Sequence, residues 1–455
     1  MKLLPFRAFR PFSGAFPSAL ILLHLATPMP AALAQATMPE SSAWSGEAAS
    51  GSSDLFDLEE CVRLALRANP DLQAQRAALD ASRSDIIAAR SDRFPSVGLT
   101  GSASRFDNGE GGSMNRRDLG VSVRQTLYRG GRVSAGVSAA ESSFTADAAA
   151  LDGARSDLIL AVRTAWYQAA QARRLVISSE QGLERSRLNL EYAEAQLLAG
   201  LGTRTDVLRA RVDVSAAELD LTEAGNVLKA AKATLNTLMG QSPAQPLDLA
   251  PDSREEPLPS LPSWEELRRA ALEAREELRV AQARTARQEA VVRLARGEFL
   301  PTVNADGGVN WGVTGSQEPR DSWSVGLALS LPLFEGFANS AELQAEKALL
   351  EASRFDEQTA RQQVEGEVWN ALLSEEAAAR TLDNAQALFE AAQENLDAAQ
   401  EGYRQGLSSM IALVDARTAF TDAERILIQA EYGHRITYAV LDRVIGRDLF
   451  REEWQ

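Results

Sequence analysis

Few residues in this chain have the chemistry that catalysis or metal binding requires. Its 455 residues include only 2 histidines and 1 cysteine. His24 falls in an N-terminal export signal, described below, which leaves His434, and no nucleophile motif accompanies that histidine. Cys61 cannot form an intrachain disulfide, and we expect it to be a small apolar contact in the first helix. The carboxylates are scattered along helices, so we expect no enzyme, no metal site and no cofactor.

Two glycine–leucine turns are better candidates for a binding function. Gly200-Leu201-Gly202-Thr203 and Gly406-Leu407-Ser408-Ser409 each separate two long helix-forming segments. Glycine at the end of a helix can adopt a positive φ without strain, so each turn is a place where the chain reverses. A leucine exposed at such a turn indicates contact with a partner protein.

The N-terminal residues indicate export. Lys2, Arg7 and Arg10 precede the apolar run 19–26, and the run 32–34 (Ala-Leu-Ala) is a plausible cleavage site. We interpret residues 1–34 as a secretory signal peptide; a disordered basic tail is the alternative. No later segment has the apolar length of a transmembrane helix, so the mature chain is either soluble or built as a β-barrel. The net charge of −16 argues against nucleic acid as a partner.

The chain repeats itself at an offset of 206 residues, without an insertion or deletion between the matches. Proline, glycine and asparagine keep this register, which chance similarity between helix-rich segments does not explain. The matching pairs include Glu59 with Glu265, Leu66 with Leu272, Pro95 with Pro301, Gly130 with Gly336, Asn189 with Asn395, Gly200 with Gly406, Arg211 with Arg417 and Gly240 with Gly446. A period this long predicts a duplicated unit and not a stack of small repeats.

Each copy predicts the same order of elements. In repeat 1 (55–240), a helix over 57–93 is followed by a β-hairpin over 96–128, a long helix over 133–199 and a return helix over 206–239. Repeat 2 (263–449) has its hairpin at 302–333. A flexible segment (35–54) precedes the repeats, a proline-rich linker (241–262) joins them, and a tail (450–455) follows.

Both hairpins alternate between apolar and small polar residues. In the second hairpin, Val325, Leu327 and Leu329 alternate with Ser324, Gly326 and other small residues. This dyad pattern is typical of a membrane β-barrel, although a half-buried soluble hairpin has the same period. Tryptophans at 311 and 323 favour the barrel, because tryptophan is enriched at membrane interfaces.

Seven-residue spacing near the end of each long helix predicts a coiled-coil seam with large residues at one position and small residues at the other. The large positions are Val176, Leu183, Leu190 and Leu197 in repeat 1, and Leu382, Phe389, Leu396 and Tyr403 in repeat 2. The small positions are Ser179, Ser186, Ala193 and Gly200, and Ala385, Ala392, Ala399 and Gly406. An ordinary amphipathic helical hairpin has the same spacing and is the alternative.

The order and spacing of these elements resemble the TolC-like outer membrane efflux proteins over about residues 55–449. Pro95 and Pro301 before the strands, the hairpin exits 127–130 and 333–336, and the two Gly-Leu turns carry the resemblance. It implies a mainly α fold with a membrane β-barrel portion, built from a duplicated helix–β-hairpin–long helix–helix unit. Three chains would form a twelve-stranded β-barrel in the outer membrane and an α-helical tube in the periplasm. Four strands alone cannot close a barrel in lipid, which agrees with a homotrimer.

The resemblance also implies function and partners. The chain would be the exit duct of a tripartite efflux or type I secretion system, contacting outer membrane lipid, a periplasmic adaptor (membrane fusion) protein and an inner-membrane pump of RND, ABC or MFS type. The adaptor-docking turns would comprise Gly200, Leu201, Thr203, Gly406, Leu407 and Ser409. The pore gate would comprise Asp206, Tyr403 and Asp415. Ser408 and Ala412 stand where the family pattern has a gating arginine and a second acidic residue, which argues against a charge-locked gate.

Simpler roles compete with these assignments. Asp206 fits a helix-capping residue, Asp415 a solvated surface charge, and Tyr403 a large residue of the seam. The alternative function is that of a periplasmic coiled-coil interaction protein without a transport pore. Within the channel class, the sequence does not separate drugs, metals and secreted proteins as substrates.

Overall fold

The computed structural model describes residues 55–107, 113–250, 261–315 and 318–446. The predicted signal peptide, the N-terminal segment 35–54 and the C-terminal tail lie outside the described residues, as does part of the linker. We therefore describe the two repeats and not the segments that flank them.

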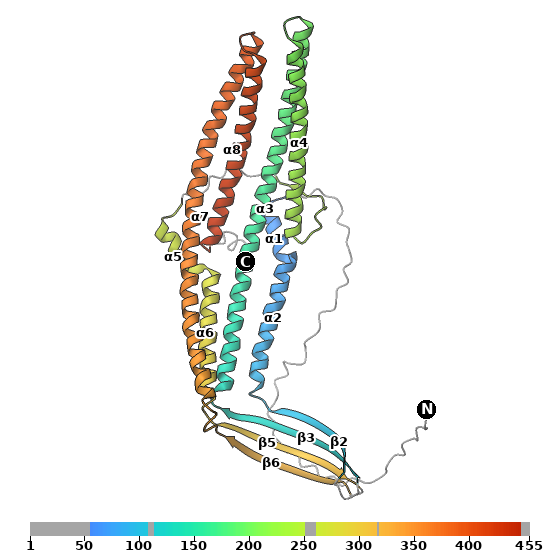
Figure 1. Cartoon of the computed structure of the whole chain (residues 1–455), viewed down its shortest axis with the longest axis vertical. Coiled ribbons are helices and arrows are strands. Elements are labelled where there is room, and N and C mark those ends of the chain that lie inside the picture. The colour runs from blue at the N-terminus through green and yellow to red at the C-terminus, as the bar shows by residue number, and fades with distance from the viewer. Residues whose placement is uncertain (1–54, 108–112, 251–260, 316–317, 447–455) are drawn as a thin grey trace, which may run out of the picture. The chain divides into compact units, whose positions relative to one another are not determined.

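The described chain consists of two copies of one unit, and each helix of the second copy begins and ends 206 residues after its counterpart (Figure 1). The first copy contains α1 (Leu58–Ala68), α2 (Pro70–Ser91), β2 (Ser96–Asp107), β3 (Ser113–Arg129), α3 (Arg132–Leu198) and α4 (Arg204–Leu238). The second contains α5 (Trp264–Ala274), α6 (Glu276–Gly297), β5 (Thr302–Thr314), β6 (Arg320–Ser330), α7 (Ala338–Arg404) and α8 (Met410–Val444). Two short strands, β1 (Leu55–Phe56) and β4 (Asp248–Leu249), pair in parallel.

The prediction of one continuous helix over 57–93 is wrong, because the chain breaks between α1 and α2. Asn69 has an extended backbone, and its side chain accepts a hydrogen bond of 3.1 Å from the Leu72 amide. Pro70 occupies the first position of α2, where its missing N–H has no helical partner to lose. The second copy breaks at the equivalent place, where Arg275 separates α5 from α6 with a similar backbone.

The four long strands form one antiparallel sheet in the order β2-β3-β5-β6. Side chains alternate between its two faces, and one face carries exposed apolar residues, including Val97, Leu99, Trp323, Val325 and Leu327. The other face carries small and polar residues. The register shifts once between β3 and β5, between Thr126 and Tyr128, close to the exit of the hairpin.

The helices pack around separate apolar cores. One core joins α1, α3, α4 and α8, and it includes Cys61, Val62, Trp166, Leu235 and Tyr432. Burial, with smaller contributions from Asp57 and Glu60, raises the pKa of the Cys61 thiol to about 12. The expected role of Cys61 as a small apolar contact in the first helix is thus confirmed. No helix in the described ranges has the length and apolar character needed to cross a membrane.

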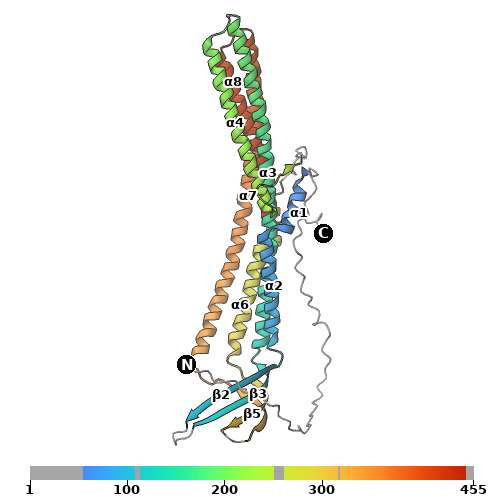
Figure 2. The same cartoon turned by 90° about the vertical axis from the view of Figure 1, so that its right-hand side faces the viewer.

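A second core joins the two helical hairpins α3/α4 and α7/α8 towards their turns (Figure 2). Small seam residues make close packing possible, because Ser186, Ala193, Ala385 and Ala392 are all buried. The large seam residue Leu396 is also buried, whereas Leu197, next to the first turn, remains 39% exposed. The seam residues are therefore packed along the coil, whereas the last large residue of the first repeat is partly exposed beside its turn.

Candidate functional site

Both Gly-Leu turns have the same backbone structure. Gly200 has a φ of 72° and Gly406 a φ of 76°, so both lie in the left-handed region. The Leu201 amide donates to the Gln196 carbonyl at 2.9 Å, and the Leu407 amide donates to the Gly402 carbonyl at 2.7 Å. The Gly200 and Gly406 amides donate to the carbonyls of Leu197 and Tyr403, both at 3.1 Å. Together these bonds make each turn a Schellman motif, which satisfies carbonyls that the helix end leaves free.

The leucine of each turn projects into solvent, with Leu201 79% and Leu407 80% exposed. In a Schellman motif this residue frequently packs on an apolar side chain five or six residues earlier. Here the residues at these positions are Gln196 and Ala195 in the first turn and Gly402 and Glu401 in the second, and none of them has a large apolar side chain. The two leucines are consequently apolar groups without a cover in the single chain.

Thr203 and Ser409 are the N-caps of the helices that follow the turns. The Thr203 hydroxyl accepts from the Asp206 amide at 3.2 Å, and the Asp206 carboxylate accepts from the Thr203 amide at 3.0 Å. The Ser409 hydroxyl accepts from the Ala412 amide at 3.2 Å. Asp206 is thus half of a capping box, while Ala412 at the equivalent position cannot reach back.

Tyr403 contacts the first repeat across the coil. Its ring packs edge-to-face against that of Tyr192, with 5.8 Å between the centroids. Partial burial raises the pKa of the Tyr403 hydroxyl, and the nearby charge of Asp206 and the Tyr192 hydroxyl raise it further. Tyr403 and Asp206, two of the three predicted gate residues, are therefore close enough for the carboxylate charge to affect the phenol.

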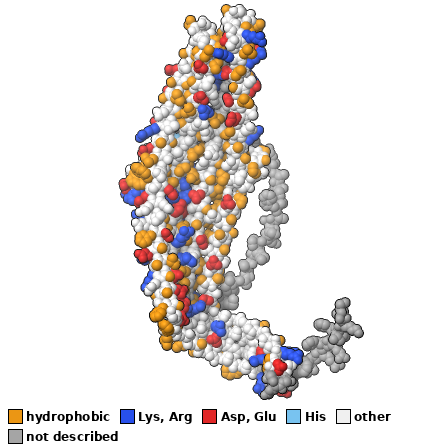
Figure 3. Space-filling view, in the orientation of Figure 1, with side chains coloured by type: hydrophobic (Ala, Val, Ile, Leu, Met, Phe, Trp, Pro, Cys, Tyr) orange, Lys and Arg blue, Asp and Glu red, His pale blue; other side chains and the backbone are white. Residues whose placement is uncertain are grey.

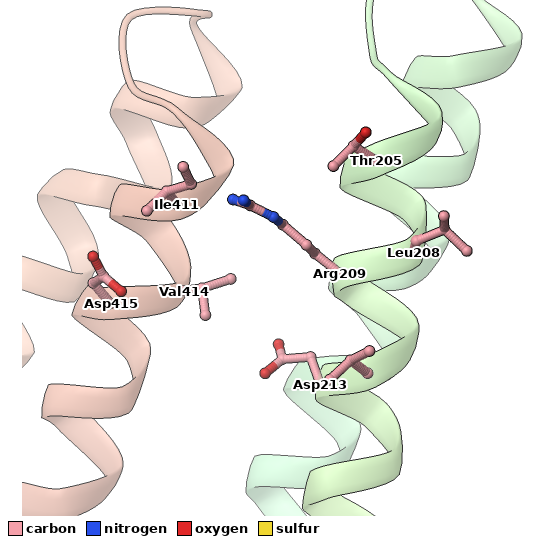
Figure 4. Close-up of a pocket in the computed structure, with 8 residues that line it drawn as sticks. Thr205, Leu208, Arg209, Asp213, Ile411, Val414 and Asp415 are labelled. Atoms are coloured by element: carbon pink, nitrogen blue, oxygen red, sulfur yellow. The ribbon is translucent and has the colours of Figure 1, made fainter.

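Asp415, the third predicted gate residue, lines a pocket of about 410 Å³ between α4 and α8. Leu208, Arg209 and Val414 are among the other residues that line it, and Arg209 extends from α4 towards α8 (Figure 4). Asp415 is exposed in the single chain, so the arrangement leaves its carboxylate open to solvent or to a neighbouring subunit.

An ion pair that the sequence did not reveal joins the repeats further from the turns. Arg417 of α8 pairs with Asp213 of α4, and their side chains are 11% and 14% exposed. Arg417 Nη1 also donates to the buried Ser186 hydroxyl of α3 at 2.8 Å. Three helices, two from the first repeat and one from the second, thus meet at one guanidinium.

A second set of polar contacts between α3 and α8 lies beside the Arg417 pair. Ser178 of α3 donates to the Glu424 carboxylate of α8 at 2.8 Å, and Arg185 approaches the same carboxylate at 3.7 Å. The Arg185 guanidinium also lies over the Phe420 ring, 5.1 Å from its centroid. These contacts fix α8 against α3 beside the Arg417 pair.

A charged cluster anchors the opposite end of α8. Arg443, which is 8% exposed, contacts Asp157 of α3 and Glu276 and Glu277 of α6 at 2.9 to 3.3 Å. Burial alone would raise the pKa of Glu277, but its backbone hydrogen bond and the charges of Arg275 and Arg443 hold the pKa below its usual value. α8 is thus tied to α3 near the turns, through Arg417 and Glu424, and again at its opposite end, through Arg443.

The family model that describes outer membrane efflux proteins matches this chain twice, over residues 61–241 and 267–447. The chain is 30% identical over 347 residues to protein CyaE of Bordetella pertussis, and the match covers 72% of each protein. It is 24% identical over 429 residues to outer membrane protein TolC of Escherichia coli, covering 88% of this chain and 85% of that protein.

Solved structures show the same fold. A crystal structure of CusC superposes with a TM-score of 0.76 at 19% identity, covering 86% of this chain and 92% of that one. The resemblance to TolC-like proteins, the mainly α fold with a barrel portion and the outer membrane location are confirmed. The chain is a transport protein and not an enzyme, and the two family matches coincide with its two repeats: it belongs to the outer membrane efflux protein family.

Proposed function

We propose that this chain is the outer membrane exit duct of a tripartite efflux or type I secretion system. Three copies form one channel, whose barrel crosses the outer membrane and whose helices receive substrate from a periplasmic adaptor and an inner-membrane pump. The family supports an efflux channel in general terms. The described geometry supports the particular roles given to the turns, the gate and the strands.

The observation that carries the proposal is the pair of exposed leucines. Leu201 and Leu407 project from turns with the same backbone geometry, in two repeats that differ at most other positions. A Schellman turn needs only its glycine, so the turn itself does not require leucine at the next residue. An uncovered apolar residue retained at both ends indicates a shared contact, and we assign Gly200, Leu201, Thr203, Gly406, Leu407 and Ser409 to adaptor docking.

The gate is assigned to Asp206, Tyr403 and Asp415. Tyr403 lies near Asp206 although they come from different repeats, so movement of α7 away from α4 would separate them. Asp415 would meet its own symmetry mates around the three-fold axis. The nearly buried pair between Arg417 and Asp213 lies further from the turns, and breaking it would cost more than breaking an exposed pair.

The edges of the sheet favour a trimer. β2 and β6 each pair on one side only within the described chain. An open strand edge in lipid would leave backbone groups unpaired at a cost of several kcal/mol each. Joining β6 of one copy to β2 of the next gives twelve strands from three copies.

The substrate follows from the pump in this proposal. Relatives of the chain carry names as different as cobalt-zinc-cadmium resistance protein CzcC of Cupriavidus metallidurans and toluene efflux pump outer membrane protein TtgC of Pseudomonas putida. Because relatives of one family are named for metals and for toluene, we assign the choice of substrate to the inner-membrane partner and not to the channel.

The experiment replaces both leucines by aspartate in the native host. Leu201→Asp with Leu407→Asp should abolish resistance to the exported compound, while trimers still reach the outer membrane. Replacement of both by methionine is the matched control and should preserve resistance, because methionine keeps an apolar surface of similar size. A photoreactive amino acid at either position should cross-link to the adaptor. Full resistance with aspartate at both turns would contradict docking at these leucines.

A further inference from the structure

Two arginines lie at the turn end of the first hairpin, on the apolar face of the sheet. Leu119 belongs to that face, and because side chains alternate, so does Arg117, two residues earlier. The register pairs Arg117 with Ala103 and Asn115 with Arg105. Arg105 and Arg117 are therefore diagonal neighbours on one face of β2 and β3, and both are exposed.

The arginines of the opposite face differ, because each has an acidic partner. Arg116 pairs with Asp118 at 2.8 Å, and Arg124 pairs with Asp306 at 2.7 Å. These pairs point to the small-polar face, which lines the channel. Their positive charge is thus neutralised within the sheet.

On the apolar face the positive charge is not neutralised in this way. Among the residues that the structure describes, neither Arg105 nor Arg117 forms an ion pair, and Arg105 donates to the Ser113 hydroxyl at 2.7 Å. Asp107 follows Arg105 on the same face, nearer the turn, and Asp321 lies on β6, with β5 between it and β3. Basic side chains lie beside acidic ones at this end of the sheet (Figure 3), and the strands there contain arginine but no lysine.

The neighbouring residues place the two arginines at the edge of the membrane. Trp311 pairs with Leu119, and Trp323 pairs with Val309, so both tryptophans lie at the turn end of the apolar band. Tryptophans mark the interface between hydrocarbon and headgroups. Arg117 pairs with Val313, two residues beyond Trp311 and on the same face. Since the helices occupy the periplasm, this end of the sheet faces the outer leaflet.

We propose that Arg105 and Arg117 form a binding site for the phosphate groups of lipopolysaccharide, the phosphorylated glycolipid of the outer leaflet. A guanidinium can donate two parallel hydrogen bonds to one phosphate, which makes such a contact stronger than one made by a point charge. Two guanidinium groups at diagonal positions can hold one phosphate between them or two phosphates of one lipid. Acyl chains of the same lipid would then lie along the exposed apolar residues of β2 and β3.

The internal repeat indicates which residue of the neighbouring subunit faces Arg105, an inference that rests on the proposed trimer. Leu119 pairs with Trp311 between β3 and β5. Leu119 is equivalent to Val325 of β6 in the repeat, and Trp311 is equivalent to Arg105 of β2. If β6 of one subunit pairs with β2 of the next in the same register, the partner subunit's Val325 lies opposite Arg105. An apolar neighbour leaves the guanidinium of Arg105 free to bind lipid.

The test measures lipid binding by the purified full-length protein in mild detergent, using native mass spectrometry. The probe is lipid A carrying two phosphates, with dephosphorylated lipid A and inorganic phosphate as comparisons. The unmodified protein should retain phosphorylated lipid A at least about tenfold better than the dephosphorylated form. Replacing Arg105 and Arg117 by glutamine should remove that preference. Arg116→Gln, which removes one charge from the neighbouring residue on the opposite face, is the matched control and should keep it.

Several outcomes would overturn the proposal. They are equal retention of the two lipid A forms by the unmodified protein, unchanged binding in the double variant, equal loss in Arg116→Gln, or displacement of lipid A by inorganic phosphate at equal concentration. The first outcome decides the matter even if the double variant does not fold. The same spectra count the chains in each particle, so failure of the trimer is distinguished from failure of lipid binding.

Discussion

Arg417 of α8 and Asp213 of α4 form a nearly buried ion pair that joins the two repeats, whereas Arg211, the equivalent of Arg417 in the first repeat, forms an exposed one. Arg211 pairs with Glu194 at 3.0 Å, with side chains 61% and 46% exposed. The duplicated unit thus carries the same residue type twice in two environments. Only the copy in the second repeat spans the boundary between the helical hairpins.

Replacing Arg417 by alanine should destabilise the coil much more than replacing Arg211. Loss of Arg417 leaves Asp213 without its partner in a poorly solvated place, at a cost of about 3 kcal/mol. Loss of Arg211 should cost less than about 1 kcal/mol, because exposed pairs contribute little. Urea unfolding followed by circular dichroism measures both values. Equal effects of the two substitutions would show that the buried pair has no special role.

The same substitution should change the channel. If the pair holds α8 against α4, Arg417→Ala should raise the single-channel conductance of the protein in a planar bilayer, while Arg211→Ala should leave it at the parent value. A conductance unaltered by Arg417→Ala would separate the stability role of the pair from any role in gating.

The turn glycines should resist replacement for a conformational reason alone. A Cβ at Gly200 or Gly406 would meet no atom within 4 Å, yet both residues have a positive φ. Alanine at either position should therefore destabilise the protein by about 1 to 2 kcal/mol. Gly225, inside α4 and equally free of neighbours, is the control. Gly225→Ala should stabilise by up to about 1 kcal/mol, because alanine favours a helix.

Asp415→Ala should reduce the preference of the channel for cations. Three copies around the axis would concentrate negative charge at the entrance and attract cations. Ala412, one helical turn earlier, adds no second ring, so we expect the initial preference to be modest. Reversal potentials in a salt gradient measure it. Asp397→Ala removes the same charge from an exposed site on α7 and should leave selectivity as it is; if both variants behave alike, Asp415 is an ordinary surface charge.

Acid should weaken the anchor at the end of α8. The pKa of Glu277 is lowered in the folded chain, so its stabilising effect is present above the unfolded pKa and is lost as pH falls through the folded pKa. Glu277→Gln should consequently be less stable than the parent at pH 7, and the difference should shrink below about pH 4. Unfolding curves across this range measure the difference, and a gap independent of pH would argue against an ionic contribution.

The 206-residue offset was visible in the sequence because proline and glycine hold the register, and every helix pair follows it. The sequence also contains a signal for the break between α1 and α2, since Asn69 is the N-cap of α2 and Pro70 is its first residue. The amphipathic pattern continued across it, and periodicity alone cannot distinguish one helix from two in line. The pairing of β1 with β4 involves two residues per strand, too few to give any pattern.

The tie between Arg417 and Asp213 could not be predicted for a different reason. Arg211 and Arg417 occupy equivalent positions in the two repeats, so the sequence does not indicate which of them is buried. Which of them is buried depends on how α8 packs against α3, a long-range property. Asp206 shows the reverse case, because both its capping and its gating interpretation could be stated beforehand, and the structure adds that its carboxylate caps α4 while lying near Tyr403.

The unbroken length of α3 and α7 makes each of them a spacer of fixed reach. Each helix has 67 residues, which corresponds to roughly 100 Å at about 1.5 Å per residue. Inserting one residue would advance the turn by about 1.5 Å and rotate its leucine by about 100° around the helix axis. Insertions of about 18 residues, five full turns, would restore the direction but not the distance. A partner that docks on both leucines, as we propose, would fix the helix length in both repeats together, because a change in one repeat alone would leave the two leucines at different heights.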